Sequence, residues 1–161
     1  MPVKVKITEK RNTPKLKAIL NMPKMSIRVG TNTNYSVGNN FDVFGLSDVL
    51  ENGANAGRNR SVHIPGWKYN EKAFEKFKPK GKNLYLQGVH RVINGRFTID
   101  GMLNQIGVEA AEGYKQTVEE IKNPHNAPAT IAKKGFDNPM IDTGYFKFNI
   151  SAQINGGRVV R

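Results

Sequence analysis

One amphipathic segment, residues 100–122, constrains the fold of this 161-residue chain more than any other feature. Its apolar side chains recur at spacings of three and four, which places them on one face of an α-helix. Thr98 or Asp100 can cap the first turn, and Asn123-Pro124 ends the helix. A helix with one apolar stripe needs a covering layer, so a second kind of element must pack on it. The stripe consists of Leu103, Ile106, Ala110, Tyr114, Val118 and Ile121.

Two segments supply strand patterns for that layer. Residues 25–29 alternate polar and apolar side chains before Gly30, which is typical of a strand that ends in a turn. Residues 145–154 carry apolar side chains at every second position, which predicts a strand with one buried face. We therefore expect an α+β fold in which a small, mostly antiparallel sheet packs on one long helix, about 100–122, with long loops.

The segment before residue 66 is expected to contain a short helix and a long loop. Residues 44–50 read as a helix with Ser47 as a possible N-cap, closed by Asn52-Gly53. Residues 53–65 combine glycine, asparagine and arginine, so we expect an irregular, mobile loop there.

The following residues are less decisive. Trp67 stands in a Pro-Gly turn and is expected to be buried. Residues 70–77 predict one or two helical turns broken at Pro79, whereas residues 84–93 fit either short strands or a helix. Residues 130–135 predict one helical turn or a loop closed by glycine.

Positive charge is the strongest compositional feature. The chain has 25 Lys and Arg against 13 Asp and Glu, a net charge of +12, and residues 1–24 alone carry +6. Pro14 and Pro23 disfavour a long helix in this stretch, so we expect an extended basic arm over 1–24, followed by a single domain over 25–161. Such charge favours polyanion partners, although a solvated basic face is an equal alternative. The candidate contacts to DNA or an acidic partner are Lys4, Lys6, Lys10, Arg11, Lys15, Lys17, Lys76, Lys78, Lys80 and Lys82.

The sequence lacks the residues that several kinds of functional site require. With no cysteine, disulfides, zinc ribbons and thiol nucleophiles are excluded. The three histidines are far apart in sequence without metal-ligand spacing, and no phosphate-binding glycine loop or nucleophile elbow occurs. No apolar run has the length of a secretory or membrane-spanning segment. We therefore expect no cofactor, no metal and no membrane partner.

One string has a catalytic appearance. Met140-Ile141-Asp142-Thr143-Gly144 resembles the active-site loop of retroviral-type aspartic proteases, in which two carboxylates share one proton. A chain with one copy would have to dimerise through this loop. Tyr145 stands where those enzymes have alanine or serine. A turn in which Asp142 bonds backbone amides and Gly144 has a positive φ explains the same residues without catalysis.

The same string belongs to a longer pattern. Residues 126–135 read Asn-Ala-Pro-Ala-Thr-Ile-Ala-Lys-Lys-Gly, and residues 138–144 read Asn-Pro-Met-Ile-Asp-Thr-Gly. In this order, and after a long helix, they resemble a family of tailed-bacteriophage proteins that complete the tail or build the neck between head and tail. A weaker similarity covers residues 46–53 and Ile64-Pro65. The matching positions are Pro128, Thr130, Ile131, Lys134, Gly135, Pro139, Ile141, Asp142, Thr143 and Gly144.

The resemblance implies a structural role in the virion and no catalysis. Proteins of this kind assemble into closed rings, here expected to be six- or twelve-fold, that join the head connector or portal side to the tail. The expected location is the virion neck, with the host cytoplasm during assembly, and packaged DNA is a possible channel partner. The alternatives are a basic nucleic-acid-binding domain and, more remotely, a hydrolase that uses Asp142-Thr143-Gly144.

Overall fold

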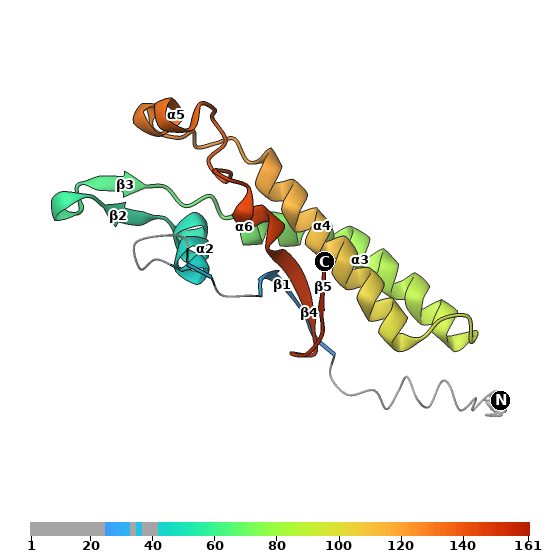
Figure 1. Cartoon of the computed structure of the whole chain (residues 1–161). Coiled ribbons are helices and arrows are strands. Elements are labelled where there is room, and N and C mark those ends of the chain that lie inside the picture. The colour runs from blue at the N-terminus through green and yellow to red at the C-terminus, as the bar shows by residue number, and fades with distance from the viewer. Residues whose placement is uncertain (1–24, 33–34, 37–41) are drawn as a thin grey trace, which may run out of the picture.

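The computed structural model describes residues 25–32, 35–36 and 42–161. Two long helices, α3 (Tyr69–Ile93) and α4 (Ile99–Glu120), lie side by side along the length of the molecule. A small sheet packs on α4, and α2 (Val43–Asn52) lies near the end of α4 from which the chain continues to α5 (Figure 1). The expected α+β class is therefore confirmed, but with two long helices instead of one.

The sheet has three strands in the order β1 (Ile27–Thr31), β4 (Ile150–Ile154) and β5 (Val159–Val160), and all its pairings are antiparallel. It approaches α4 closely at Gly107. A Cβ at this glycine would lie 2.9 Å from Val160 Cγ2 and 3.3 Å from Ala152 Cβ. The absent side chain thus allows the sheet to lie directly on the helix.

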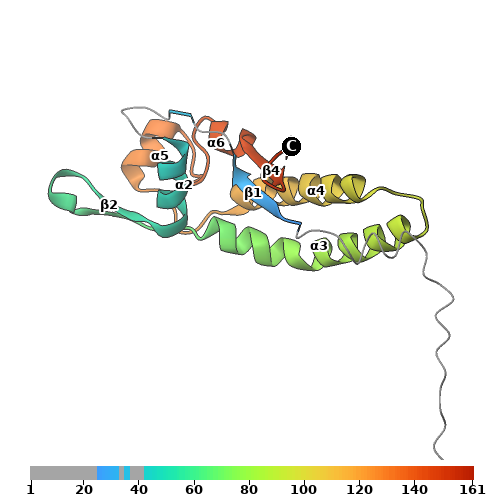
Figure 2. The same cartoon turned by 90° about the horizontal axis from the view of Figure 1, so that it is seen from below.

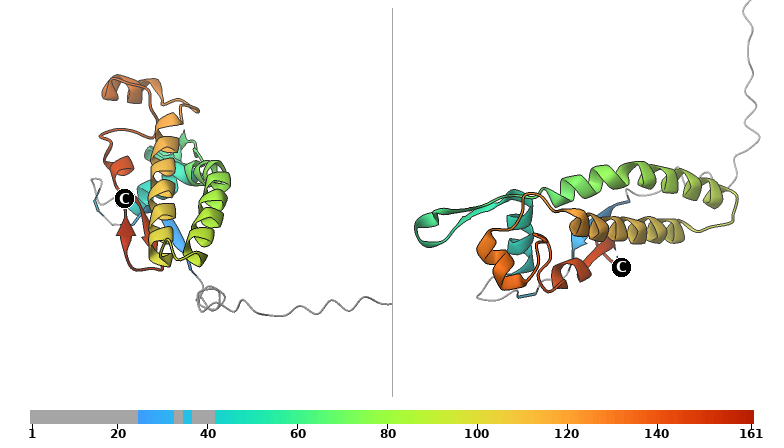
Figure 3. Two further views of the ribbon diagram at one scale, coloured as in Figure 1. Left: turned by 90° about the vertical axis from the view of Figure 1, so that its right-hand side faces the viewer. Right: turned by 90° about the horizontal axis from the view of Figure 1, so that it is seen from above.

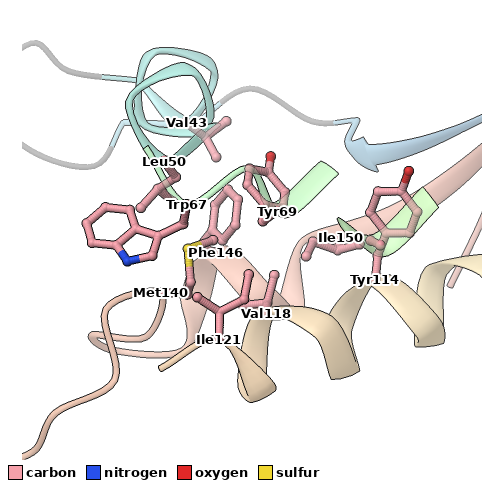
Figure 4. Packing of buried hydrophobic residues seen from close by; sticks show 11 residues of the cluster. Val43, Leu50, Trp67, Tyr69, Tyr114, Val118, Ile121, Met140, Phe146 and Ile150 are labelled. Carbon is pink, nitrogen blue, oxygen red and sulfur yellow. The ribbon is translucent and has the colours of Figure 1, made fainter. Parts of the chain in front are cut away.

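The core is built around α4. Five of the six predicted stripe residues are buried and Ile106 is partly buried, which confirms the helical interpretation. Thr98 accepts a hydrogen bond from Gly101 N at 3.0 Å and is the N-cap. Figure 4 shows the larger cluster, where α2, α4 and α6 meet around Trp67 and Tyr69. A second cluster consists of Val92, Met102, Leu103 and Ile154.

The prediction that the first helix breaks at Pro79 is wrong. α3 has 25 residues and passes through Pro79. Glu75 and Pro79 are both exposed, so water can bond the carbonyl that loses its usual N–H partner. Packing on α4 offsets the remaining cost of the lost hydrogen bond. The two helices approach closely at Gly88, where a Cβ would overlap the buried side chain of Met102.

The expected irregular loop over 53–65 is a β-hairpin. β2 (Ala54–Ala56) pairs antiparallel with β3 (Val62–Ile64), and a short 3₁₀ turn, η1 (Arg58–Arg60), joins them. Figures 2 and 3 show this hairpin extending away from the helices. Neither strand contains a buried residue, so no hydrophobic pattern marked them in the sequence.

Two further details differ from expectation. Asp42, not Ser47, caps α2, with Gly45 N donating to Asp42 Oδ1 at 2.7 Å; Ser47 bonds the buried Tyr69 hydroxyl at 2.6 Å instead. The predicted strand over 145–154 begins with a helical turn, α6 (Tyr145–Phe148), and only Ile150–Ile154 forms β4. Phe148 is consequently 65% exposed. Trp67 is buried, as expected.

No helix in the described ranges is both long enough and apolar enough to cross a membrane.

Candidate functional site

The family-like segment 128–144 begins as a short helix at one end of the molecule (Figure 1). Pro128 opens α5 (Pro128–Lys134), and Gly135 closes it in a left-handed conformation, with its N–H donating to Ile131 O at 2.8 Å. Of the two alternatives predicted for residues 130–135, the helical turn closed by glycine is therefore the one that forms. None of the seven residues of α5 is buried, Thr130 included. α5 therefore projects from the core and does not form part of it.

Asp137 closes the base of this projection. Its Oδ1 accepts hydrogen bonds from the backbone N and the Nδ2 of Asn126, both at 3.1 Å, and its Oδ2 lies 2.6 Å from His125 Nδ1. The pKa of Asp137 lies below its usual range, first because the Asn126 backbone N–H favours the charged form and also because of His125. One carboxylate thus joins the chain before α5 to the chain after it.

Asn138 connects the same loop to the core. It is buried, its Nδ2 donates to Glu119 O at the end of α4, and its Oδ1 accepts from Met140 N. Lys134 Nζ donates to Asn138 O at 2.7 Å. Partial burial lowers the pKa of Lys134, with Asp142 and Asp137 acting in the opposite direction. Lys134 therefore holds the loop, and Pro139 beside it is buried.

Asp137→Asn is expected to change the acid response of this loop. Because the folded pKa of Asp137 is depressed, the stabilisation by its carboxylate is present above the unfolded value of about 3.9 and is lost as pH falls through the folded pKa. The variant should lack this dependence and should loosen α5 at neutral pH. Hydrogen exchange of residues 126–137 between pH 3 and pH 7 measures it. Identical pH profiles for the two proteins would contradict the role given to the carboxylate.

The Asp142-Thr143-Gly144 turn has the predicted positive φ, 80°, at Gly144. Thr143 Oγ1, rather than Asp142, accepts the backbone hydrogen bond, from Tyr145 N at 3.3 Å. Asp142 is exposed and Ile141 partly buried. The side chain of Thr143 therefore holds this turn, and the predicted bonds from Asp142 to backbone amides are absent in the described structure.

A pocket of about 450 Å³ lies between this turn and α2. Leu46, Leu50 and Met140 give it apolar walls, and Asp142 is the carboxylate among its described lining residues. The buried Tyr35 hydroxyl on its wall has no hydrogen-bond partner within the part of the chain that the structure describes. An aspartic-protease reaction needs a second carboxylate beside Asp142, which a second copy of the chain would have to provide, because the described lining of one chain holds none. Over the same ranges no three His, Asp or Glu side chains are grouped to hold a metal.

The basic candidates divide into two groups. Lys4, Lys6, Lys10, Arg11, Lys15 and Lys17, and with them the expected extended arm, lie outside the described residues. On α3, Lys76 pairs with Glu120, Lys78 lies 3.3 Å from Glu75, and Lys80 lies 2.6 Å from Glu109. Lys82 remains at the rim of an apolar groove. Carboxylates therefore already neutralise much of the charge on α3 that the sequence suggested for DNA.

That apolar groove was not predicted. It has a volume of about 540 Å³ and is lined by residues of α3, α4 and the start of the sheet. Phe74 and Tyr85 of α3 are 54% and 47% exposed in it, while Phe77 is partly buried. The helical spacing of Phe74, Phe77, Gly81 and Tyr85 would have indicated this row if the helix had been extended past Pro79. The other apolar lining residues are Met25, Ile27, Leu103 and Ile106.

Comparison with protein-family models, with curated proteins and with solved structures finds no match for this chain.

Proposed function

We propose that this chain is a structural virion protein of a tailed phage, a neck or tail-completion subunit that assembles with copies of itself into a closed ring between head connector and tail. The motif residues over 128–144 suggest the class. The observation that carries the proposal is structural: the chain extends two elements, α5 and the β2–β3 hairpin, that bury none of their own residues.

Neither projection would be stable by itself. A two-stranded hairpin is marginally stable by itself, and a seven-residue helix is shorter than any that persists alone in water. The molecule nevertheless fixes both at their bases, with Gly53 and Gly66 under the hairpin and Asp137 under α5. α5 and the two strands of the hairpin, which are anchored but uncovered, fit contacts with a neighbouring subunit.

The exposed row on α3 supplies a different surface for the other side of the contact. Phe74 and Tyr85 present aromatic area beside Lys82, and aromatic residues are enriched at the buried centres of protein interfaces. A contact that uses different surfaces on its two sides is heterologous, and repetition by a closing rotation generates a ring. We assign this groove to a second copy of the chain.

The proposal assigns no catalytic step, cofactor or metal. The remaining faces of the ring would meet the portal-side and tail proteins, and DNA would pass through its channel in the virion. The buried Asn138 and Pro139 and the Thr143 bond give the motif residues a structural role in this scheme. In this account Thr143 holds the turn, and the exposed Asp142 needs no second carboxylate.

Negative-stain microscopy and light scattering of the purified protein across concentration test the proposal. The expected result is a closed ring, six- or twelve-fold. Phe74→Glu with Tyr85→Glu should leave a folded monomer, because both side chains are about half exposed. Gln87→Glu is the control, since it adds a charge to an exposed position of α3 outside the groove.

Loss of the ring in the double variant alone, with an unchanged circular dichroism spectrum, supports the assignment. A protein that stays monomeric at all concentrations and is absent from phage particles contradicts the proposed function. A ring that survives both glutamates keeps the function but places the contact elsewhere.

A further inference from the structure

The tip of the β2–β3 hairpin carries concentrated positive charge. Residues 53–66 contain no Asp or Glu, and Arg58 and Arg60 are both exposed. Neither arginine takes part in an ion pair in the described structure. On α3, by contrast, Lys76, Lys78 and Lys80 all have carboxylate partners. Carboxylates therefore compensate three of the lysines on α3, whereas the two arginines at the hairpin tip have no carboxylate partner in the described structure.

The turn that presents these arginines has an unusual backbone. Asn59 and Arg60 have φ values of 65° and 55°, in the left-handed region that non-glycine residues rarely adopt. At Arg60 this conformation costs about 1–2 kcal/mol relative to the right-handed region, whereas asparagine adopts it more readily. Two hydrogen bonds hold the turn, from Arg60 N to Gly57 O at 3.1 Å and from Ser61 Oγ to Arg58 O at 3.2 Å. Arg58 and Arg60 therefore belong to one turn whose backbone conformation is held by these two hydrogen bonds.

The chemistry of the tip favours phosphate over a protein surface. The sequence of the turn, Gly57-Arg58-Asn59-Arg60-Ser61, contains hydrogen-bond donors but no apolar or aromatic side chain. Aromatic residues, methionine and arginine are enriched at the centres of protein interfaces, and of these only arginine is present in the turn. Arginine, asparagine and serine side chains are typical contacts to DNA phosphates, and arginine binds them in a bidentate geometry.

The shape of the hairpin agrees with this chemistry. It projects from the helices, and a two-stranded ribbon can enter the major groove of DNA (Figure 2). The cross-strand pair of Asn55 and His63, 3.1 Å apart and exposed, places further polar groups behind the tip. We propose that the tip of this hairpin binds the phosphate backbone of double-stranded nucleic acid through Arg58 and Arg60. This site does not require ring assembly.

The test is the salt dependence of binding to a labelled DNA duplex of mixed sequence, measured by fluorescence anisotropy on the full chain. The double variant Arg58→Gln with Arg60→Asn removes two charges and keeps a residue that tolerates a positive φ at position 60. Loss of two phosphate contacts should reduce the slope of log K against log salt by about 1.8. The matched control, Lys76→Gln with Lys80→Gln, removes the same charge from α3 and should leave the slope nearly unchanged.

A third variant, Arg58→Lys with Arg60→Lys, keeps the charge and should retain the slope of the parent protein. Equal losses in the tip and α3 variants would show general attraction by a basic protein and overturn the proposal. A tip variant that binds DNA like the parent protein would overturn it as well. Binding to polyglutamate with the same dependence on the tip arginines would indicate an acidic protein partner instead, and would also contradict the proposal.

Discussion

Gly53→Ala is expected to destabilise the protein by about 3–5 kcal/mol, one of the two largest effects we expect of a single substitution. Gly53 has a φ of 79°, and an added Cβ would lie 2.6 Å from Ile64 O and 2.8 Å from Gly66 N. These are backbone atoms at the base of the hairpin, so they cannot rotate away as a side chain can. Trp67 N also donates to Leu50 O at 2.8 Å beside them and keeps the two chain segments together.

Gly135→Ala provides a matched control. Its φ is 78°, but no atom lies within 4 Å of an added Cβ, so it should cost only the backbone term of about 1–2 kcal/mol. Chemical unfolding followed by the fluorescence of Trp67, the single tryptophan, compares the two variants. The difference between them measures the steric part alone. Equal losses of unfolding free energy in the two variants would mean that the backbone around Gly53 can move apart without a measurable cost.

The two chain segments at the base of the hairpin also approach closely at Gly66, which follows β3. A Cβ at Gly66 would lie 2.6 Å from Glu51 O and 2.9 Å from Gly53 N. The two glycines therefore face each other where the hairpin leaves α2 and returns to α3. This explains how a hairpin with no buried residue keeps a defined starting point. It also connects the glycines to the proposed functions, since both subunit contact and phosphate binding use what projects from this base.

The sequence predicted α4 well for a physical reason. One face of α4 meets the core along its whole length, so burial imposes a continuous apolar stripe from Leu103 to Ile121. α3 lacks this signal. It buries only Tyr69, Ala73, Gly88 and Val92, contains Pro79, and leaves Phe74 and Tyr85 exposed in the groove. Its helical structure depends on packing against α4, which no local pattern reports.

The candidate site also combines features that the sequence predicts with features that it does not. Turn chemistry is local, so the sequence correctly predicted the positive φ of Gly144 and the closure of α5 by Gly135. The Asp137 bonds join positions 11 and 12 residues apart, and the bond from Asn138 to Glu119 O spans 19 residues. These partners meet only because α4 ends where the loop returns. Asn138 lies within the sequence motif, whereas no local pattern in the sequence marks Asp137.

The distribution of charge shows most directly how the fold differs from what the sequence predicts. In the sequence, Lys76, Lys78 and Lys80 look like a basic patch, while Arg58 and Arg60 look like part of a loop. The fold brings Glu109 and Glu120 of α4 beside α3 and leaves the hairpin without any acidic neighbour in its own sequence. The net charge of the sequence predicts a polyanion partner without a location, and the arrangement of the helices is what leads us to propose the hairpin tip as the place where it binds.

Trp67→Ala is expected to cost about 3–5 kcal/mol and to loosen both projections together. Trp67 is 6% exposed and packs among Leu50, Met140 and Phe146, as Figure 4 shows. Its Nε1 donates to Pro124 O at 2.8 Å, just before the chain enters α5, while its backbone N bonds Leu50 O at the base of the hairpin. One residue thus joins the bases of α5 and the hairpin to the same core.

Trp67→Phe separates packing from the hydrogen bond. Phenylalanine keeps most of the buried aromatic surface and leaves the Pro124 carbonyl open to water, so the expected cost is only about 1–2 kcal/mol. Unfolding is followed by circular dichroism, because both variants lack the tryptophan signal. Hydrogen exchange should increase in Trp67→Ala over residues 54–64 and 125–137 together, and ring assembly should decline with it. If only one of these segments loosens, Trp67 does not couple the two projections, and each must be held to the core by its own contacts.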